Sequence, residues 1–422
     1  MSLHDFDCDG ATSEVRMLRR TGLSILLATV LVDMIGFGIV LPLLPFYAED
    51  LGASPFEVTL IIASFSALQL VSAPIWGRFS DRRGRRLLII IGLFASAVSY
   101  LLFALAGSIT VLLLSRMAAG AAGGTISVAQ AYVADSTEGN ERARGLGMVG
   151  AASGLGIMLG PAIGGYFSRY GLGAPGLVAA GLCLLNAFAA IAFLPESRQF
   201  QGRLADRAKG QVVTLGGWVR SLTEFPLRLL LAVYFLAISS FTSMTSVLAL
   251  YMQRVFSMTA VDMGLVFTLA GAVTVVVRGV LVGRVVKIFG EASTVRAGCL
   301  LLAVSVGTIA FIPNRWWLAL LVPLWAISTG MIFPSLHSLI SRATDEHSQG
   351  SVLGGSQLAG GLGRVVGPLW AGALFQTYAI GSPFLVGAFL STIAVIIAVR
   401  IPSPQEQDGE GKIGPPTGGA VR

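Results

Sequence analysis

The stretch Gly77-Arg-Phe-Ser-Asp-Arg-Arg-Gly-Arg-Arg86 holds five arginines and one aspartate in ten residues. It lies between two apolar stretches, residues 56–76 and 87–106. A helix of about 20 apolar residues crosses the roughly 30 Å hydrocarbon core of a bilayer. The pattern therefore predicts two membrane-spanning helices joined by a short basic loop.

The composition of the whole chain is typical of a membrane protein. Of 422 residues, 54% are hydrophobic and 12% are charged, whereas soluble domains average about 25% charged residues. The mean hydropathy is +0.78, which leaves too little polar surface to cover a water-soluble globule. The net charge of +7 does not indicate a nucleic-acid partner, because the basic residues fall in loops on one side of the spans.

Twelve apolar stretches recur along the chain, and in lipid each must be a helix, because its backbone polar groups have no other partners. We therefore expect an all-α integral membrane protein with twelve transmembrane helices in two pseudo-symmetric six-helix bundles. The expected spans are residues 22–47, 56–76, 87–106, 109–134, 144–167, 174–194, 227–253, 261–283, 294–312, 316–341, 349–375 and 381–401.

The distribution of basic residues predicts the orientation in the membrane. An even number of spans places both termini on the same side. With both termini in the cytoplasm, roughly 23 of the 29 basic residues lie on the cytoplasmic side, as the positive-inside rule requires. We expect a multi-pass protein of the cell inner (plasma) membrane.

The chain divides into two halves that resemble each other. Gly160-Pro161 recurs as Gly367-Pro368, and Gly77-Arg78 recurs as Gly283-Arg284. Six-helix repeats with a site at their interface form a transporter architecture. The expected segments are a cytoplasmic tail (1–21), an N-terminal bundle (22–195), a cytoplasmic linker (196–226), a C-terminal bundle (227–401) and a disordered cytoplasmic tail (402–422).

Asp33 is the acidic residue expected at mid-membrane depth, about eleven residues into the first span. Desolvation raises the pKa of such a carboxylate and a nearby cation lowers it, so a site between these effects can take up and release a proton. The functional interpretation is proton or cationic-substrate binding. The alternative is a structural ion pair or a packing hydrogen bond.

Arg116 lies in the fourth span, before several small residues that allow helices to pack closely. Its guanidinium cannot readily lose its charge and needs an acceptor. Asp33 is the expected acceptor, with backbone carbonyls of the first span as alternatives. Snorkelling toward the external interface is a competing interpretation.

The basic loop has features beyond positive charge, namely two glycines and an embedded acid. Asp81 precedes the third span, where a carboxylate can meet helix N-terminal amides. Asp135, at the cytoplasmic end of the fourth span, is a candidate partner for Arg85 or Arg82. Weak pairs of this kind suit a latch that breaks in each cycle. The candidate latch comprises Gly77, Asp81, Arg82, Gly84, Arg85 and Asp135.

Glycines and prolines mark positions of close packing or bending. The simplest interpretation is close helix packing, and a bend that governs opening of a cavity is the alternative. The residues concerned are Pro42, Pro45, Gly156, Gly160, Pro161, Gly164, Gly165, Gly367 and Pro368.

Polar and aromatic residues within the spans are candidates for lining a substrate cavity. Arg364, midway along the eleventh span, either lines the cavity or bonds backbone carbonyls. Arg278 and His337 lie near cytoplasmic helix ends, where snorkelling and helix-end hydrogen bonding are the expected roles. The candidates are Phe37, Gln69, Tyr132, Tyr234, Phe241, Tyr251, Gln357 and Arg364.

Several motifs resemble those of the major facilitator superfamily. The stretch 77–86 resembles the signature between its second and third helices. Asp33 with the downstream Gly and Pro residues resembles the first-helix motif of its twelve-helix drug:proton antiporters, a group that includes tetracycline efflux proteins. Arg116-x3-Gly120 and Gly156-x3-Gly160-Pro161-x2-Gly164-Gly165 are similar to the fourth- and fifth-helix motifs.

The resemblance implies alternating access by two rocking bundles, with proton coupling through Asp33 and Arg116 and a latch at Asp81, Arg85 and Asp135. It also implies a monomer. Within the stretch 77–86, Phe79 and Ser80 replace the Leu and Ala that are usual in the family signature, which is a mild departure.

The sequence therefore favours a secondary active transporter that exports small amphipathic compounds or drugs in exchange for protons. The alternative is a facilitator or proton-coupled importer of a sugar, amino acid or organic anion. A membrane protein that binds a partner without transport is a third possibility. We expect no enzyme, cofactor, metal site or nucleic-acid partner, because the sequence shows no P-loop, metal-ligand spacing or nucleophile–base pair. The expected partners are a small-molecule substrate, protons and the lipid bilayer.

Overall fold

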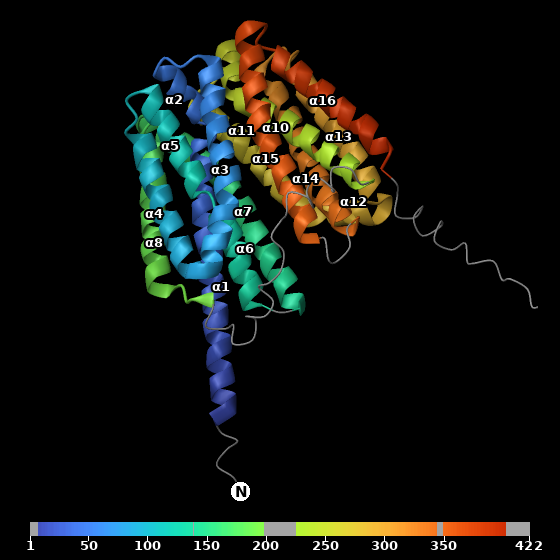
Figure 1. The fold of residues 1–422 in the computed structure, drawn as a ribbon. Helices are drawn as coiled ribbons and strands as arrows, with labels where there is room; N and C mark the ends of the chain where they lie inside the picture. The colour runs from blue at the N-terminus through green and yellow to red at the C-terminus, as the bar shows by residue number, and fades with distance from the viewer. Residues whose placement is uncertain (1–6, 138, 198–224, 344–348, 402–422) are drawn as a thin grey trace, which may run out of the picture.

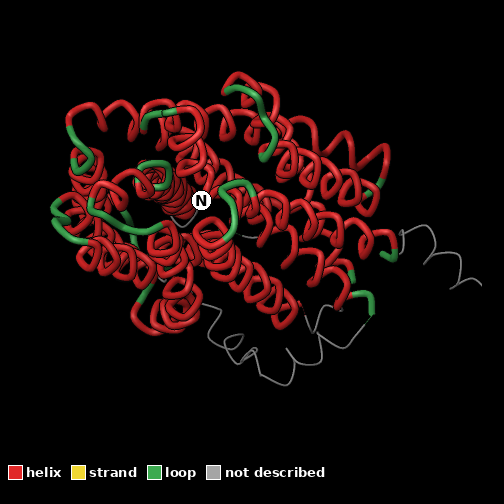
Figure 2. The backbone as a smooth tube through the Cα atoms, turned by 90° about the horizontal axis from the view of Figure 1, so that it is seen from above, coloured by secondary structure: helices red, strands yellow, loops and turns green. Residues whose placement is uncertain are grey.

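The computed structural model describes residues 7–137, 139–197, 225–343 and 349–401, and their regular elements are all helices (Figure 1 and Figure 2). In these residues, twelve helical segments are long and apolar enough to cross a membrane. The predicted fold class is therefore confirmed. The expected tail 402–422 and nearly all of the expected linker 196–226 lie outside the described residues.

The N-terminal half, which runs from blue to green in Figure 1, precedes the linker. Its helices are α1 (Asp7–Val40), α2 (Leu44–Asp50), α3 (Pro55–Arg83), α4 (Arg85–Ala104), α5 (Ile109–Ala122), α6 (Thr125–Ser136), α7 (Gly139–Phe167) and α8 (Ala174–Phe193), with a 3-10 turn, η1 (Ser168–Tyr170).

The C-terminal half, from yellow to red, follows the linker. Its helices are α10 (Leu227–Phe256), α11 (Ala260–Val276), α12 (Val282–Phe289), α13 (Glu291–Ile309), α14 (Leu318–Arg342), α15 (Gln349–Thr377) and α16 (Ser382–Val399). A π-helical turn, η4 (Val277–Leu281), joins α11 to α12, and a 3-10 turn, η5 (Arg315–Trp317), precedes α14.

Two of the expected spans are interrupted. The first breaks between α1 and α2 at residues 41–43, beside Pro42 and Pro45, because proline lacks the N–H that a continuous helix needs. The fourth breaks between α5 and α6 at Gly123 and Gly124. Side chains of α3 bond the carbonyls at this second break, among them Gln69 to the carbonyl of Gly123 at 3.3 Å.

The ends of two further elements also differ from expectation. The eighth span continues through η4 to Phe289, beyond the expected end at 283. Helix α1 begins at Asp7, inside the expected tail 1–21. The basic end of the molecule is the end that carries residues 77–86 and the start of α1, and the α2 end is the opposite end (Figure 1).

Each half is built on one pair of closely packed helices, α1 with α7 and α10 with α15. Gly156, Gly160 and Gly164 of α7 face α1, and a Cβ added at Gly160 would lie 2.6 Å from the Cα of Gly38. In the second half, Gly367 lies against Ser239 of α10 in the equivalent way. Association of helices in lipid relies on such close packing, because lipid tails are as apolar as the side chains.

Substitution of Gly160 by Ala tests this packing. The added methyl has no space unless α1 and α7 separate, so we expect a loss of about 1–3 kcal/mol in stability, as for other overpacked sites. The measurement is the thermal unfolding transition of the purified protein in detergent.

Gly150 provides a matched control on the same helix. A Cβ there meets nothing within 4 Å, and alanine favours helix by about 0.5–1 kcal/mol relative to glycine. Gly150→Ala should therefore unfold at the same temperature as the parent or a higher one. Equal transitions for Gly160→Ala and the parent would contradict the packing role.

Candidate functional site

Asp33 faces the interior of the N-terminal half. Its side chain is 7% exposed and is hydrogen-bonded by Ser96 of α4. On the same face of α1, the carbonyl of Thr29 accepts a hydrogen bond from the Asn186 amide of α8 at 3.1 Å. Gly36 lies one turn further along this face, against the ring of Tyr100. Asp33 is thus enclosed by α1, α4 and α8 rather than placed between the two halves.

Arg116 is buried nearby, and the pair with Asp33 that the sequence predicted is not formed. The Arg116 guanidinium lies over the rings of Phe103 and Tyr100, at 4.8 and 5.5 Å from their centroids. Its Nε donates to Ser115 at 3.4 Å, while one terminal nitrogen has no hydrogen-bond partner among the described residues. At 5% exposure, the side chain does not snorkel to a surface.

Tyr100 lies close to both charges, and each interacts with it electrostatically. A desolvated cation–π contact stabilises by about 2 kcal/mol. A buried donor left without a partner costs about 1–3 kcal/mol, and more when it is charged. The Arg116 guanidinium is therefore held by aromatic faces and still lacks an anionic partner.

The candidate latch is built around Arg85. Its guanidinium contacts Asp81 of α3 at 2.6 Å and Asp135 of α6 at 2.8 Å, and it also donates to Ser80. Arg85 and Asp135 are largely buried, with exposed side-chain fractions of 12% and 18%. One guanidinium therefore ties together α3, α4 and α6.

Residues 77–86 do not form the expected loop. Helix α3 continues to Arg83, and Gly84 alone connects it to α4, with a φ of 97° that favours glycine. Gly77 lies within α3, and a Cβ there would meet nothing within 4 Å. Arg82 is exposed on the last turn of α3.

Glu196 is part of this region, although the sequence did not point to it. Its carboxylate accepts the backbone N–H of Arg85, the first residue of α4, at 2.9 Å. A carboxylate at a helix N-terminus is favourable because free N–H groups and the helix dipole both attract it. The sequence assigned this role to Asp81, which instead pairs with the Arg85 side chain.

The two halves meet at the α2 end, where an ion pair joins them. Glu49 of α2 contacts Arg254 of α10 at 2.7 Å. The Arg254 guanidinium also lies over the ring of Phe375, 5.2 Å from its centroid. Beside the ion pair, the backbone N–H of Phe56 donates to the side chain of Gln376 at 3.1 Å. Both contacts join the N-terminal half to the C-terminal half.

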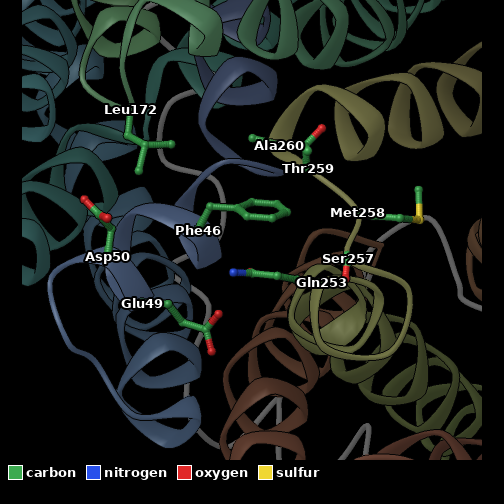
Figure 3. A pocket seen from close by; sticks show the side chains of 9 residues that line it. All are labelled: Phe46, Glu49, Asp50, Leu172, Gln253, Ser257, Met258, Thr259 and Ala260. Atoms are coloured by element: carbon green, nitrogen blue, oxygen red, sulfur yellow. The ribbon is translucent and has the colours of Figure 1, made fainter.

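A pocket of about 590 Å³ lies beside this ion pair. Figure 3 shows Phe46 and Glu49 from the N-terminal half facing Gln253 from α10. Its lining residues are Phe46, Glu49, Asp50, Leu172, Gln253, Ser257, Met258, Thr259 and Ala260. The pocket therefore belongs to the surface of the α2 end, away from Asp33 and Arg116.

The two halves also meet at glycines, where α7 of the N-terminal half packs on α11 of the C-terminal half. A Cβ on Gly165 would lie 3.2 Å from the Cα of Gly264, and one on Gly271 would lie 2.7 Å from Met158. Between α3 and α15, Thr59 meets Gly372 and Leu70 meets Gly361. Gly165 thus contributes to the junction between halves, whereas Gly156, Gly160 and Gly164 pack within the N-terminal half.

These contacts end before the basic end. Gly77 continues the α3 face that carries Thr59 and Leu70, since spacings of 11 and 7 residues keep to one side of a helix. Gly147 continues the α7 face that carries Met158. A Cβ at either glycine would meet nothing within 4 Å. The halves therefore diverge from the α2 end toward the basic end, and the space between them opens there.

The candidate cavity residues have different surroundings. Tyr132 and Tyr251 are core residues, at 2% and 5% exposure, so their expected cavity role is wrong. The Tyr132 hydroxyl donates to the Pro195 carbonyl at 2.9 Å, and the Tyr251 ring packs on Phe384 with centroids 5.0 Å apart. Gln357 is exposed.

The other aromatic candidates are half-buried or form contacts across helices. The rings of Phe37 and Phe65 lie 5.3 Å apart. Phe333 of α14 meets both Tyr234 and Phe241 of α10, with centroids 5.8 and 6.3 Å apart.

The family model described as Major Facilitator Superfamily matches residues 26–368, and again residues 279–418. The chain belongs to the Major Facilitator Superfamily. Its members are transporters, and this chain is a multi-pass membrane transporter.

Similar proteins include drug-resistance proteins of bacteria. The chain is 29% identical over 385 residues to the tetracycline resistance protein, class C, of Escherichia coli, covering 90% of this chain and 96% of that protein. It is 28% identical over 388 residues to multidrug resistance protein 2 of Bacillus subtilis (strain 168), covering 89% and 94%.

A solved structure has the same fold. The human organic anion transporter MFSD10 (TETRAN) superposes with a TM-score of 0.66 at 24% identity, over 90% of this chain and 99% of that one. At this identity the likeness shows a shared fold alone.

In this superfamily fold, the Glu49–Arg254 ion pair is a contact that closes the α2 end. Neither residue stood out in the sequence, because each lies near a helix end where charges are common. Their meeting depends on how the two halves dock. The sequence does contain a signal for them: an acid follows the first span of the N-terminal half, and a base lies at the same end of the first span of the C-terminal half.

Substitution of Glu49 by Gln tests the closure. We expect about fivefold more molecules with the α2 end open, because exposed pairs contribute about 0.2–1 kcal/mol and this pair, with Glu49 only 15% exposed, belongs at the upper end of that range. Spin labels at Leu105→Cys and Phe311→Cys, exposed positions at this end of the two halves, report the distance by double electron–electron resonance.

Asp50→Asn is the matched control, because Asp50 lines the same pocket and forms no ion pair with the C-terminal half among the described residues. The charge-swapped double variant Glu49→Arg with Arg254→Glu should restore the parent distances. If Glu49→Gln and Asp50→Asn give the same distance distribution, the pair does not control closure.

Proposed function

We propose that this transporter exports small amphipathic compounds or drugs in exchange for protons, by alternating access. The observation that carries the proposal is Asp33, a carboxylate buried in the N-terminal half near a cation that lacks an anionic partner. Such residues are costly in a membrane and commonly mark proton or ion pathways. The names of the bacterial relatives, which are resistance proteins, support the same function.

The orientation follows from the positive-inside rule. We take the basic end as cytoplasmic, with both termini on that side and the protein in the inner membrane as a monomer. The moving units are the bundles 22–195 and 227–401, joined by the linker 196–226, with the tail 402–422 in the cytoplasm. In this orientation, the described conformation is open to the cytoplasm and closed on the outside by the contacts of the α2 end.

Proton binding at Asp33 changes the electrostatics of the N-terminal half. When Asp33 is ionised, its carboxylate attracts the Arg116 guanidinium, and Tyr100 lies close to both groups. Protonation removes that attraction and leaves the guanidinium on the aromatic rings. The arrangement therefore gives Arg116 two environments whose relative free energies depend on one proton, as a two-state switch requires.

Helix α1 provides a mechanical connection from Asp33 to the junction between halves. One face of α1 carries Asp33, and another packs on Gly156 and Gly160 of α7. Other residues of α7, Met158 and Gly165, contact α11 of the C-terminal half. Because the backbones are in contact, a shift of α1 displaces α7 and alters the junction.

The latch and the outer ion pair act at opposite ends. Closing the basic end would bring the free face of α3 at Gly77 against α15, along the line that Thr59 and Leu70 already occupy. The Arg85 contacts with Asp81 and Asp135 hold the ends of α3, α4 and α6 in the open state. Opening the outside requires the Glu49–Arg254 contact to break.

Asp33→Asn tests the coupling. The amide keeps the shape of the carboxyl and cannot exchange a proton, so we expect loss of proton-driven export while folded protein remains in the membrane. The measurement uses inside-out vesicles with a respiration-driven pH gradient and a pH-sensitive fluorophore. The substrates are cationic dyes, tetracyclines, phenicols, sugars and organic acids.

Asp262→Asn is the matched control, because Asp262 accepts the backbone N–H of Thr259, the N-cap of α11 at the α2 end, and an amide oxygen can also accept it. It should preserve substrate-triggered proton leakage. Full proton-driven export by Asp33→Asn would refute the coupling role of Asp33. If the substrate flux of the parent protein is the same with and without a pH gradient, the protein is instead a facilitator.

A further inference from the structure

Four polar side chains from four helical elements gather in the C-terminal half. The Tyr234 hydroxyl of α10 lies 3.4 Å from Nε2 of His337 of α14. The Arg364 guanidinium of α15 interacts with the same hydroxyl. Arg278 of η4 interacts electrostatically with both Tyr234 and His337. We call these four residues the basic cluster.

The basic cluster has no anionic counterpart in the part of the chain that the structure describes. No carboxylate there lies within 4.0 Å of Arg278 or Arg364. An acid of the same half, Glu291 at the start of α13, has its Oε1 in contact with Ser338 at 2.6 Å and with Arg342 at 3.3 Å, and neither of its oxygens pairs with Arg278 or Arg364. Two arginines at membrane depth without an acid are costly, and such residues are normally paired or functional.

Snorkelling does not account for Arg364, and the helix that carries Arg278 extends well beyond it. The helix that carries Arg278 continues to Phe289, about three turns beyond it. Arg364 lies near the middle of α15. The sequence predicted a span that ends at 283, with Arg278 near its cytoplasmic end, whereas the helix continues for six more residues and carries Arg284 and Lys287.

The basic cluster faces the space between the halves. Gly264, Gly271 and Val275 of α11 form the side that approaches α7. Arg278 follows Val275 by three residues and therefore continues the same side, past the last contact with α7. Arg278 is exposed, Arg364 and His337 are half-buried, and Tyr234 is buried. The cluster thus extends from the opening into the wall of the C-terminal half.

An aromatic surface adjoins the cluster. Phe333 meets the Tyr234 ring edge to face, with centroids 5.8 Å apart and planes at 84°. Gly360 lets this ring lie against α15, since a Cβ there would fall 2.4 Å from it. The close approach places the Tyr234 hydroxyl beside Arg364, which is one turn further along α15. The positive charges of the basic cluster therefore lie next to the aromatic rings of Tyr234 and Phe333.

We propose that the basic cluster is a subsite for the anionic group of an amphipathic aromatic compound, with Arg278 and Arg364 binding a carboxylate or sulfonate. The subsite rests on the transport function proposed above and specifies its substrate class. Guanidinium groups suit such anions because their paired N–H donors match two oxygens. The π-helical turn that carries Arg278 is a feature found frequently at functional sites.

The test measures binding with two probes that share a fluorophore and differ in charge. Dansylglycine carries a carboxylate, and dansylcadaverine carries an ammonium group. The full-length protein is placed in nanodiscs of phosphatidylcholine, and binding is followed by fluorescence without a proton gradient. We expect Arg278→Gln and Arg364→Gln each to raise the dissociation constant for dansylglycine about tenfold, as loss of a charge-assisted hydrogen bond does.

Three further variants make the result specific. Arg364→Lys keeps a positive charge and should retain part of the affinity. Arg315→Gln removes an exposed arginine of the α2 end, which lies over Trp316, and should leave dansylglycine binding unchanged. In the double variant Arg278→Gln with Arg364→Gln, dansylcadaverine binding should not weaken. Size-exclusion profiles and thermal transitions verify that each variant is folded.

Two outcomes would overturn the subsite. One is a parent protein that binds dansylglycine no more tightly than the double variant. The other is an equal loss of both probes in the double variant, which would indicate a charge-independent defect. Displacement of dansylglycine when phosphatidylglycerol replaces part of the phosphatidylcholine would assign the site to a lipid headgroup. None of these results depends on proton coupling, so failure of the subsite and failure of antiport are distinguishable.

Discussion

Close approach of helix backbones at glycine is the constraint on which the rest of the structure depends. Within a bilayer, apolar side chains gain little by leaving lipid, so helices associate mainly through close packing and hydrogen bonds. Gly160 brings α7 into backbone contact with α1, and Gly367 does the same for α15 and α10. The same two helices, α7 and α15, also form the junction between the halves through Gly165 and Gly372. Each half is therefore a closely packed unit, and the halves meet at contacts in which one partner is a glycine.

The charged residues show how such a junction can be biased. At the α2 end the halves share an ion pair, and at the basic end Arg85 keeps its contacts within one half. Exposed pairs contribute about 0.2–1 kcal/mol, and this range applies to the Glu49–Arg254 pair, in which Arg254 is 40% exposed, but not to the largely buried contacts of Arg85. Because the pair that joins the halves is weak, we expect a proton at Asp33 or a bound substrate to be sufficient to change which end is closed.

The sequence predicted what depends on composition and local pattern. Twelve spans, two repeated halves and the membrane depth of Asp33 follow from apolar length and from the spacing of one acid. The motif glycines were also predicted to pack closely, because glycine in a transmembrane helix allows a neighbouring helix to approach its backbone. The first span was expected to be continuous, although Pro42 and Pro45 were named as positions of packing or bending, and the break of the fourth span at Gly123 and Gly124 was missed because hydropathy does not report gaps in helical hydrogen bonding.

What the sequence missed depends on contacts between distant segments. Glu196 reaches the first amide of α4 across 111 positions, and Glu49 meets Arg254 across 205. Tyr132 and Tyr251 have the polar and aromatic character of cavity residues, yet their hydroxyls bond backbone carbonyls inside each half. Arg116 was expected to pair with Asp33. The positions of Phe103 and Tyr100 show that cation–π contacts stabilise its guanidinium without that ion pair.

The two halves carry unlike charges, enclosed in the N-terminal half and open to the space between the halves in the C-terminal half, and this difference suggests a division of roles. The N-terminal half encloses one acid and one cation, so a single proton changes the charge of its interior. In the described part of the C-terminal half, no acid lies within 4.0 Å of Arg278 or Arg364, so an anion bound as proposed would change the electrostatics of this half. An anion bound there leaves the proton site untouched, because Asp33 faces α4 and α8 rather than the opening. On these proposals, proton and substrate act on separate halves. They would influence each other through the contacts that join the halves, which are the glycine contacts of α7 with α11 and of α3 with α15, the Glu49–Arg254 ion pair and the Phe56–Gln376 hydrogen bond.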